Sequence, residues 1–182
     1  MRSLLTFCAF LALGTFGVLG YAWIIKRPSL GDLHALTPGI WVTEQVTLEQ
    51  IPGISRKFRS LVDLRPDGEA ADQPTASQMR QSSATKGVTF SYVPVPHGAI
   101  PAGVVDALGR SLESSPQPVL LYCRSGKRAA RTWALVEASR VGGLKESEIV
   151  AAVEAAGQPA GDLSAEIAAR IAARRSAEGA AR

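Results

Sequence analysis

The cysteine at position 123 is followed by a dense group of cationic side chains. The segment VLLYCRSGKRAARTWAL (residues 119–135) ends an apolar run at Cys123, places Arg124, Lys127 and Arg128 in the next five positions, and then resumes a helical pattern. A strand that turns into a helix there gathers unpaired backbone N–H groups and the positive end of a helix dipole. A thiolate is itself an anion and is stabilised in such surroundings. The pattern favours a nucleophilic cysteine over the competing interpretation, a core cysteine before an ordinary turn.

The neighbouring residues can be given roles in the same chemistry. Gly126 permits the tight turn, and Arg128 can offer two parallel donors to a tetrahedral oxyanion. His97 follows a β-rich run and is the candidate proton donor, since imidazole titrates near neutral pH; the competing interpretation is an exposed loop residue. We therefore expect Cys123, Arg128 and His97 to be catalytic, and we assign substrate binding to a wider set, which comprises Arg124, Ser125, Gly126, Lys127, Arg131, Asp63 and Arg65.

Two of these assignments carry alternatives. Asp63 and Arg65 lie at the end of a short apolar run, and we expect them to pair with each other or to brace the loop, with substrate contact as the lesser option. Arg131 lies one helical turn beyond Arg128 and is expected to reinforce the anion site.

Strands alternate with helices along the chain, a pattern typical of an α/β fold with a mainly parallel central sheet covered by helices. Ligands bind at the carboxyl ends of the strands in such sheets, where Asp63–Arg65, His97 and the Cys123 loop would converge. The predicted strands span residues 39–46 (an edge strand), 59–65, 89–96 and 118–123, and the predicted helices span 47–58, 76–86, 104–115, 128–140, 144–157 and 162–175.

The first 27 residues differ in character from the rest. Residues 4–25 carry no charge and are flanked by Arg2 and by Lys26–Arg27, which is the length and flanking expected of a transmembrane helix. A cleaved signal peptide is the alternative. We predict a single-pass membrane protein with its catalytic domain on the cytoplasmic side, where a free thiol stays reduced more easily.

The remaining composition sets further limits. The chain has 182 residues, a formal charge of +4, a pI near 9.4 and two cysteines, which argues against a disulfide scaffold. No basic run suggests nucleic acid, no residue cluster has metal-ligand spacing, and no cofactor is expected. We divide the chain into an anchor (1–27), a linker (28–36), an α/β domain (37–175) and a disordered tail (176–182).

Three segments together resemble a known family. LVDLRPDGEAADQP, TFSYVPVPHGAIPAGVVDAL and YCRSGKRAARTWAL are similar to the phosphatase-like domain of beta-lactamase hydrolase-like proteins, a relative of the dual-specificity protein phosphatases. The resemblance extends from about residue 36 to residue 171. It implies a protein tyrosine/dual-specificity phosphatase-like fold, a cysteinyl-phosphate intermediate on Cys123, oxyanion binding by Arg128 and the loop, and an anionic small molecule or phosphoprotein as substrate.

Two departures from the phosphatase pattern leave other functions open. Tyr122 stands where those phosphatases carry His, and four residues rather than five separate Cys123 from Arg128. The shorter loop resembles that of rhodanese-type sulfurtransferases, which carry a persulfide on the same cysteine and need no proton donor at His97. A non-catalytic oxyanion-binding module is the third reading of the same loop. The order of helices after the loop favours the phosphatase.

Overall fold

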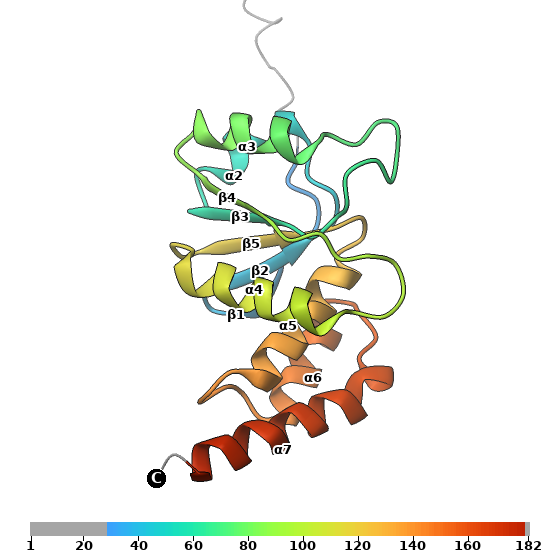
Figure 1. The fold of residues 1–182 in the computed structure, drawn as a ribbon. Coiled ribbons are helices and arrows are strands. Elements are labelled where there is room, and N and C mark those ends of the chain that lie inside the picture. The colour runs from blue at the N-terminus through green and yellow to red at the C-terminus, as the bar shows by residue number, and fades with distance from the viewer. Residues whose placement is uncertain (1–28, 181–182) are drawn as a thin grey trace, which may run out of the picture.

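A five-stranded sheet forms the centre of the domain (Figure 1), which a computed structural model describes over residues 29–180. The strand order is β1-β2-β5-β3-β4. The strands β2, β5, β3 and β4 run parallel, whereas β1 pairs antiparallel with β2, so the sheet is mixed. The strand bounds are β1 His34–Thr37, β2 Ile40–Thr43, β3 Ser60–Asp63, β4 Thr89–Tyr92 and β5 Val119–Tyr122.

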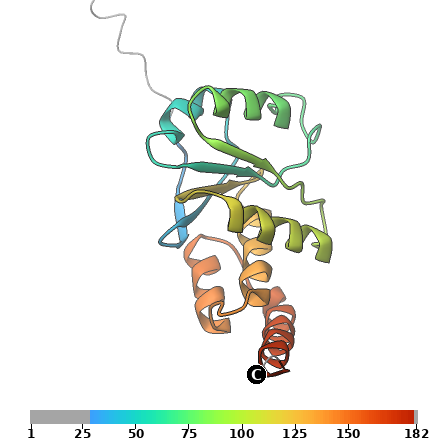
Figure 2. The ribbon, with the colours of Figure 1, turned by 60° about the vertical axis from the view of Figure 1, so that its left-hand side comes forward.

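Helices cover both faces of the sheet, and the two layers differ in size (Figures 1 and 2). The smaller layer has α2 (Ile51–Ile54) and α3 (Ala76–Ala84), and the larger has α4 to α7. The larger layer comprises α4 Ala102–Ser114, α5 Lys127–Ser139, α6 Glu146–Ala155 and α7 Ser164–Ala180; the 3-10 turns η1 Leu48–Gln50 and η2 Gly161–Leu163 precede α2 and α7.

The alternation of side chains along β5 divides the core in two. Leu121 and Cys123 face the α4–α7 layer, while Leu120 and Tyr122 face α2 and α3. Because β5 is buried on both faces, its sequence VLLY is apolar throughout, as expected of a central parallel strand. Trp133 of α5 is fully buried on the Cys123 side and anchors the helix that follows the cysteine loop.

Two sequence-based boundaries were wrong. The predicted linker 28–36 contains most of β1, and the predicted tail 176–182 overlaps α7, which continues to Ala180. β1 is only four residues long and packs a single side chain, Leu36, into the core, so its apolar signal is weak. Because β1 adds to the sheet outside β2, the strand predicted as an edge lies between β1 and β5. The extension of α7 past residue 175 consists of SAEGA, in which two alanines and a glutamate favour a helix while the glycine does not.

The membrane prediction falls on residues 4–25, which lie outside the described residues. Across residues 29–180, no helix combines the length and apolar character needed to span a bilayer. The anchor and the cytoplasmic placement therefore stay predictions.

Candidate active site

Cys123 lies immediately beyond β5, at the carboxyl end of the central strand. Its side chain is buried, with 1% of the residue exposed. The chain then turns through Gly126, whose φ of 79° is left-handed, and enters α5 at Lys127. A Cβ at position 126 would lie 3.3 Å from the carbonyl oxygen of Thr43, so a side chain there would meet both backbone strain and crowding. The sequence-based interpretation of RSGK as a tight strand-to-helix turn is confirmed.

Among the described residues, the backbone N–H groups of this turn lack acceptors, whereas two of its carbonyls accept hydrogen bonds. Within residues 29–180, none of the backbone N–H groups of residues 124–129 forms a hydrogen bond. In contrast, the Arg124 carbonyl accepts from the Gln45 N–H at 3.3 Å, and the Ser125 carbonyl accepts from Gln158 Nε2 at 3.1 Å. We call the free N–H groups of residues 124–129 the anion nest, because an arrangement of this kind binds oxyanions.

Arg128 is held beside Cys123 by an acidic residue. Its Nη1 and Nη2 donate to Glu69 Oε1 and Oε2 at 2.6 and 2.7 Å, and Nη1 also donates to the Val95 carbonyl at 2.7 Å. Hydrogen bonding to Glu69 raises the pKa of Arg128, and the neighbouring Cys123 sulfur raises it further. Only 14% of the Arg128 side chain is exposed. Arg128 therefore lies near Cys123, and its predicted role in binding an oxyanion stays a prediction.

Glu69 is the site residue that sequence reasoning missed. It lies in the loop after β3, and its carboxylate contacts Arg128, Arg65 Nε at 3.1 Å and His97 Nε2 at 3.3 Å. The hydrogen bonds from Arg128, followed by those from Arg65, lower the pKa of Glu69 to about 2 against the opposing effect of burial. The residue was detectable in principle as the one glutamate in PDGEAADQP, a loop that follows a strand bound for the ligand-binding edge.

His97 reaches the same carboxylate from the loop between β4 and α4. Its side chain is 73% exposed, so apart from the contact with Glu69 it faces solvent. This places an imidazole at the rim of the site, beside Glu69 and open to solvent. Asp106, the next carboxylate along the chain after His97, lies inside α4 and lines a groove with Val141 and Arg140 at the C-terminal end of α5, away from the cysteine loop at its other end.

Arg65 and Asp63 do not form an ion pair. The Arg65 guanidinium bonds to Glu69 and, through Nη1, to Gln45 Oε1 at 2.7 Å; only its backbone N–H reaches Asp63 Oδ1, at 2.8 Å. Asp63 is aligned across the sheet with Tyr122, on the face opposite Cys123. Burial raises the pKa of Asp63 to about 6 despite hydrogen bonding to the Arg65 N–H. Both residues therefore brace the loop, which was the first of the two alternatives. Asp63 lies on the opposite face of the sheet from the anion site.

Tyr122 points away from the nucleophile. Its ring is fully buried against α2 and α3, and its hydroxyl has no hydrogen-bond partner in the described structure. The pKa of Tyr122 is raised by burial and by the proximity of Asp63. Tyr122 therefore packs behind the loop, on the side of the sheet away from Cys123.

Arg131 does not join the anion nest. Its two Nη atoms donate to Asp162 Oδ1 and Oδ2 at 2.6 and 2.7 Å, and Nη1 also donates to the Pro159 carbonyl at 3.2 Å. The expectation that Arg131 reinforces the site is wrong, because this arginine instead fastens α5 to the connection between α6 and η2.

Arg124, Ser125 and Lys127 line the exposed side of the turn. Neither Arg124 nor Lys127 forms an ion pair within residues 29–180, so both cations are free to attract an anion.

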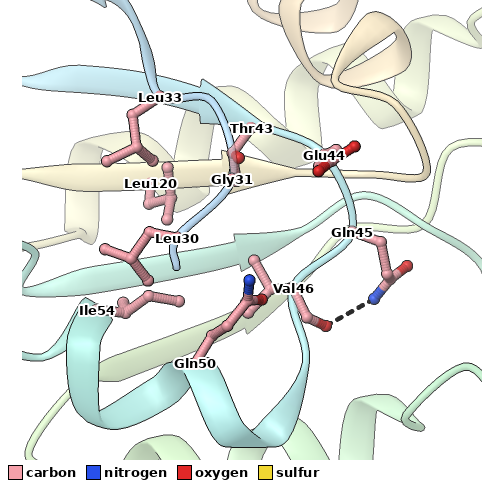
Figure 3. Close-up of a pocket in the computed structure, with 10 residues that line it drawn as sticks. All are labelled: Leu30, Gly31, Leu33, Thr43, Glu44, Gln45, Val46, Gln50, Ile54 and Leu120. Carbon is pink, nitrogen blue, oxygen red and sulfur yellow. Dashed lines mark hydrogen bonds between the residues drawn. The ribbon is translucent and has the colours of Figure 1, made fainter. Parts of the chain in front are cut away.

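A small pocket close to the site belongs to the packing of the fold and not to the candidate active site (Figure 3). It lies at the end of β2 beneath Leu30 and Leu33, and its open space of about 10 Å³ is enough for one water molecule. Gln45 extends away from the apolar lining, toward the side where it meets Arg65. The described residues also contain no group of three or more His, Cys, Asp or Glu side chains that would hold a metal ion.

The sequence and the fold agree on a family. Residues 32–140 match the family described as the phosphatase-like domain of the beta-lactamase hydrolase-like protein. The chain belongs to this family. A beta-lactamase hydrolase-like protein of Xylella fastidiosa is 33% identical over 102 residues, and one of Agrobacterium fabrum is 30% identical over 98 residues. The match covers 56% and 53% of this chain but only 23% of either relative, so the chain corresponds to about a quarter of those proteins.

Solved structures with the same fold carry phosphatase names. A candidate phosphatase from Neisseria meningitidis superposes with a TM-score of 0.64 at 26% identity, covering 74% of this chain and 94% of that protein. The active form of Tk-PTP gives 0.62 at 14% identity over 80% and 99%, and the catalytic core of the PP-IP phosphatase Siw14 from S. cerevisiae gives 0.53 at 15% over 69% and 76%. The latter two establish the fold alone. The chain therefore shares its fold with these phosphatases.

Proposed function

We propose that this phosphatase-like domain hydrolyses a phosphate ester through a phosphocysteine on Cys123. The observation that carries this proposal is the anion nest: directly after the buried Cys123, six adjacent N–H groups have no acceptor among residues 29–180. A bound phosphoryl group supplies the acceptors that these donors lack. The free cations Arg124 and Lys127 at the rim favour an anionic substrate.

In the first step the Cys123 thiolate attacks phosphorus, and the bond from phosphorus to the ester oxygen breaks. The nest and the Arg128 guanidinium stabilise the negative charge on the non-bridging oxygens. Protonated His97 transfers its proton to the leaving oxygen, so the products are an alcohol, neutral His97 and a phosphocysteine.

The second step returns the enzyme to its starting state. A water molecule attacks the phosphorus of the phosphocysteine, His97 accepts a proton from that water, and the thiolate of Cys123 leaves. Inorganic phosphate is released with His97 protonated again.

An aryl phosphate assay on the full chain tests this proposal. Wild type is expected to release phosphate slowly, and Cys123→Ser is expected to lose turnover while still binding the substrate, because serine keeps the loop geometry but is a far weaker nucleophile. Equal rates for wild type and Cys123→Ser would contradict the proposal. For His97, an unchanged pH–rate profile in His97→Ala would remove this residue from the mechanism.

A second function is favoured by the spacing within the loop. Four residues separate Cys123 and Arg128, one fewer than in the cysteine phosphatases that the sequence resembles. In a sulfurtransferase the thiolate would take a sulfane sulfur from thiosulfate, release sulfite, and pass the sulfur to cyanide or another acceptor. Thiocyanate formation that depends on Cys123, without phosphate release, would establish this function instead.

A further inference from the structure

The Glu69 carboxylate contacts three side chains near the cysteine loop. It receives three side-chain hydrogen bonds, two from Arg128 and one from Arg65, and lies beside His97. Only 13% of its side chain is exposed. The three partners come from three different segments, which follow β3, β4 and β5, so the carboxylate connects every loop that bears a candidate catalytic group.

The donors of Arg128 can be counted individually. A guanidinium has five N–H donors: one on Nε and two on each Nη. Both N–H groups of Nη1 donate, one to Glu69 and one to the Val95 carbonyl, and one N–H group of Nη2 donates to Glu69. One donor on Nε and one on Nη2 remain, and these two form the parallel side-on edge of the guanidinium. A planar fork of this kind binds two oxygens of one phosphoryl group.

Two interpretations of Glu69 follow from its contacts. As an internal anion it would occupy the place of the substrate; as an orienting group it would fix the arginine and leave the anion site open. The contacts favour orientation: among residues 29–180, none of the N–H groups of the anion nest donates to Glu69, and the Nε and the second Nη2 donor of Arg128 have no protein oxygen as acceptor. The Cys123 sulfur also lies close enough to Arg128 to raise its pKa.

We propose that Glu69 is the positioning residue of this site, which turns the side-on edge of Arg128 toward a phosphoryl group at Cys123 and holds His97 at the rim. The proposal rests on the proposed function, since it specifies how the oxyanion is bound. Arg65 supports Glu69 in turn, through its own bond to the carboxylate and its bond to Gln45.

Binding of inorganic phosphate to the full chain carrying Cys123→Ser, measured by calorimetry, tests the proposal without turnover. Glu69→Asp keeps the charge but is one methylene too short to hold both Nη atoms, so phosphate affinity should fall about tenfold. Glu69→Gln should also weaken binding. Asp162→Asn is the matched control for Glu69→Gln, because it removes the carboxylate that accepts two hydrogen bonds from Arg131, the other arginine of α5. Its phosphate affinity should stay within about twofold of that of the Cys123→Ser parent.

A double-mutant cycle separates positioning from general damage to the fold. If Glu69 acts through Arg128, then Glu69→Asp should weaken phosphate binding in the wild-type background but have little further effect once Arg128→Lys has removed the fork. Unchanged or tighter phosphate binding by Glu69→Asp, in a protein with wild-type circular dichroism and thermal unfolding, overturns the proposal and identifies Glu69 as an internal competitor. Equal effects of Glu69→Asp in both backgrounds also overturn it.

The leaving group distinguishes this outcome from a failure of the proposed function. In hydrolysis assays, Glu69→Asp should slow phenyl phosphate more than dinitrophenyl phosphate, because only phenolate needs a proton from His97. If no variant, including wild type, hydrolyses either ester while phosphate binding still depends on Glu69 and Arg128 together, the proposed function fails and the positioning role stands.

Discussion

Helix α5 carries two arginines one turn apart, and the structure gives them different roles. Arg128 and Arg131 each hold a carboxylate through both Nη atoms at nearly the same distances. The carboxylate of Glu69 is 13% exposed, whereas that of Asp162 is 67% exposed. The Glu69–Arg128 pair lies beside the thiol, while the Asp162–Arg131 pair joins two helical segments. The comparison teaches that the location and burial of the partner, rather than the arginine itself, decide which pair serves the site.

The largest expected difference between the two pairs is in activity. Arg128→Lys should lower aryl phosphate turnover by about 100-fold or more, because lysine cannot offer two parallel donors to the phosphoryl group. Arg131→Lys should stay within about threefold of wild type. Steady-state kinetics on the two variants measures this contrast. Comparable losses in both would mean that Arg131 contributes to catalysis after all.

The pH dependence of stability should also separate the pairs. Because the pKa of Glu69 falls from 4.5 to about 2 on folding, its ionised form stabilises the protein above about pH 4.5, and this contribution is lost as the pH falls toward 2. At pH 7, Glu69→Gln should lower the free energy of unfolding by about 2 kcal/mol, and the gap to wild type should narrow below pH 4. Urea unfolding between pH 3 and pH 7 measures the gap.

Asp162→Asn serves as the exposed counterpart in that experiment. Hydrogen bonding to Arg131 lowers the pKa of Asp162 too, but this carboxylate is open to solvent, so screening reduces its effect on stability. A pH-dependent gap as large as that of Glu69→Gln would show that burial does not distinguish the two pairs.

Asp63 is a third carboxylate to compare, and it is buried without an ion pair. The guanidinium of the nearby Arg65 bonds to Glu69 and Gln45 instead. Burial raises the pKa of Asp63 from 3.8 to about 6, so the folded protein holds this proton more tightly than the unfolded chain. Wild type should therefore lose stability, relative to Asp63→Asn, as the pH rises from about 4 to about 6, which is the opposite direction to Glu69. Urea midpoints of both proteins across this range give the sign. A gap that does not vary with pH would contradict the burial of an ionisable Asp63.

The smallest effects are expected at the two exposed cations. Arg124→Ala and Lys127→Ala should each raise KM by about two- to fivefold at low salt and by less at high salt, because exposed charges attract a substrate at long range and salt screens them. Measuring kcat/KM at several ionic strengths tests this. Salt-independent losses would place the two side chains in direct contact with the substrate.

The local parts of the site could be predicted from sequence because they depend on adjacent residues. An apolar strand, a glycine and a helix with a cationic start suffice to place Cys123, the anion nest and Arg128. Glu69 could not be found in this way, since it lies 59 residues from Arg128 in the sequence. The two residues meet only because the loop after β3 lies beside the start of α5 in the folded chain. Arg131 was assigned to the site on helical spacing alone, and spacing does not reveal that Asp162 holds its guanidinium.

The fold shows the same division between local and distant information. The buried strands β3 and β5 and the helices α3 to α6 follow from periodicity and turn residues, and their positions agree with the sequence to within a few residues. β1 escaped prediction because its pairing with β2 depends on the backbone and on one buried leucine. Its antiparallel addition converts the expected edge strand into an internal one.

Detection of a covalent intermediate on Cys123 tests the central claim most directly. The full chain is mixed with dinitrophenyl phosphate, whose leaving group needs no proton from His97, quenched in acid within the first turnover, and examined by mass spectrometry of the peptide that contains Cys123. We expect a phosphoryl group on this cysteine in wild type, a larger amount of it in His97→Ala, where hydrolysis of the intermediate lacks its base, and none in Cys123→Ser. An unmodified Cys123 during turnover, or a cysteine that gains sulfur from thiosulfate and no phosphoryl group from the ester, would contradict it.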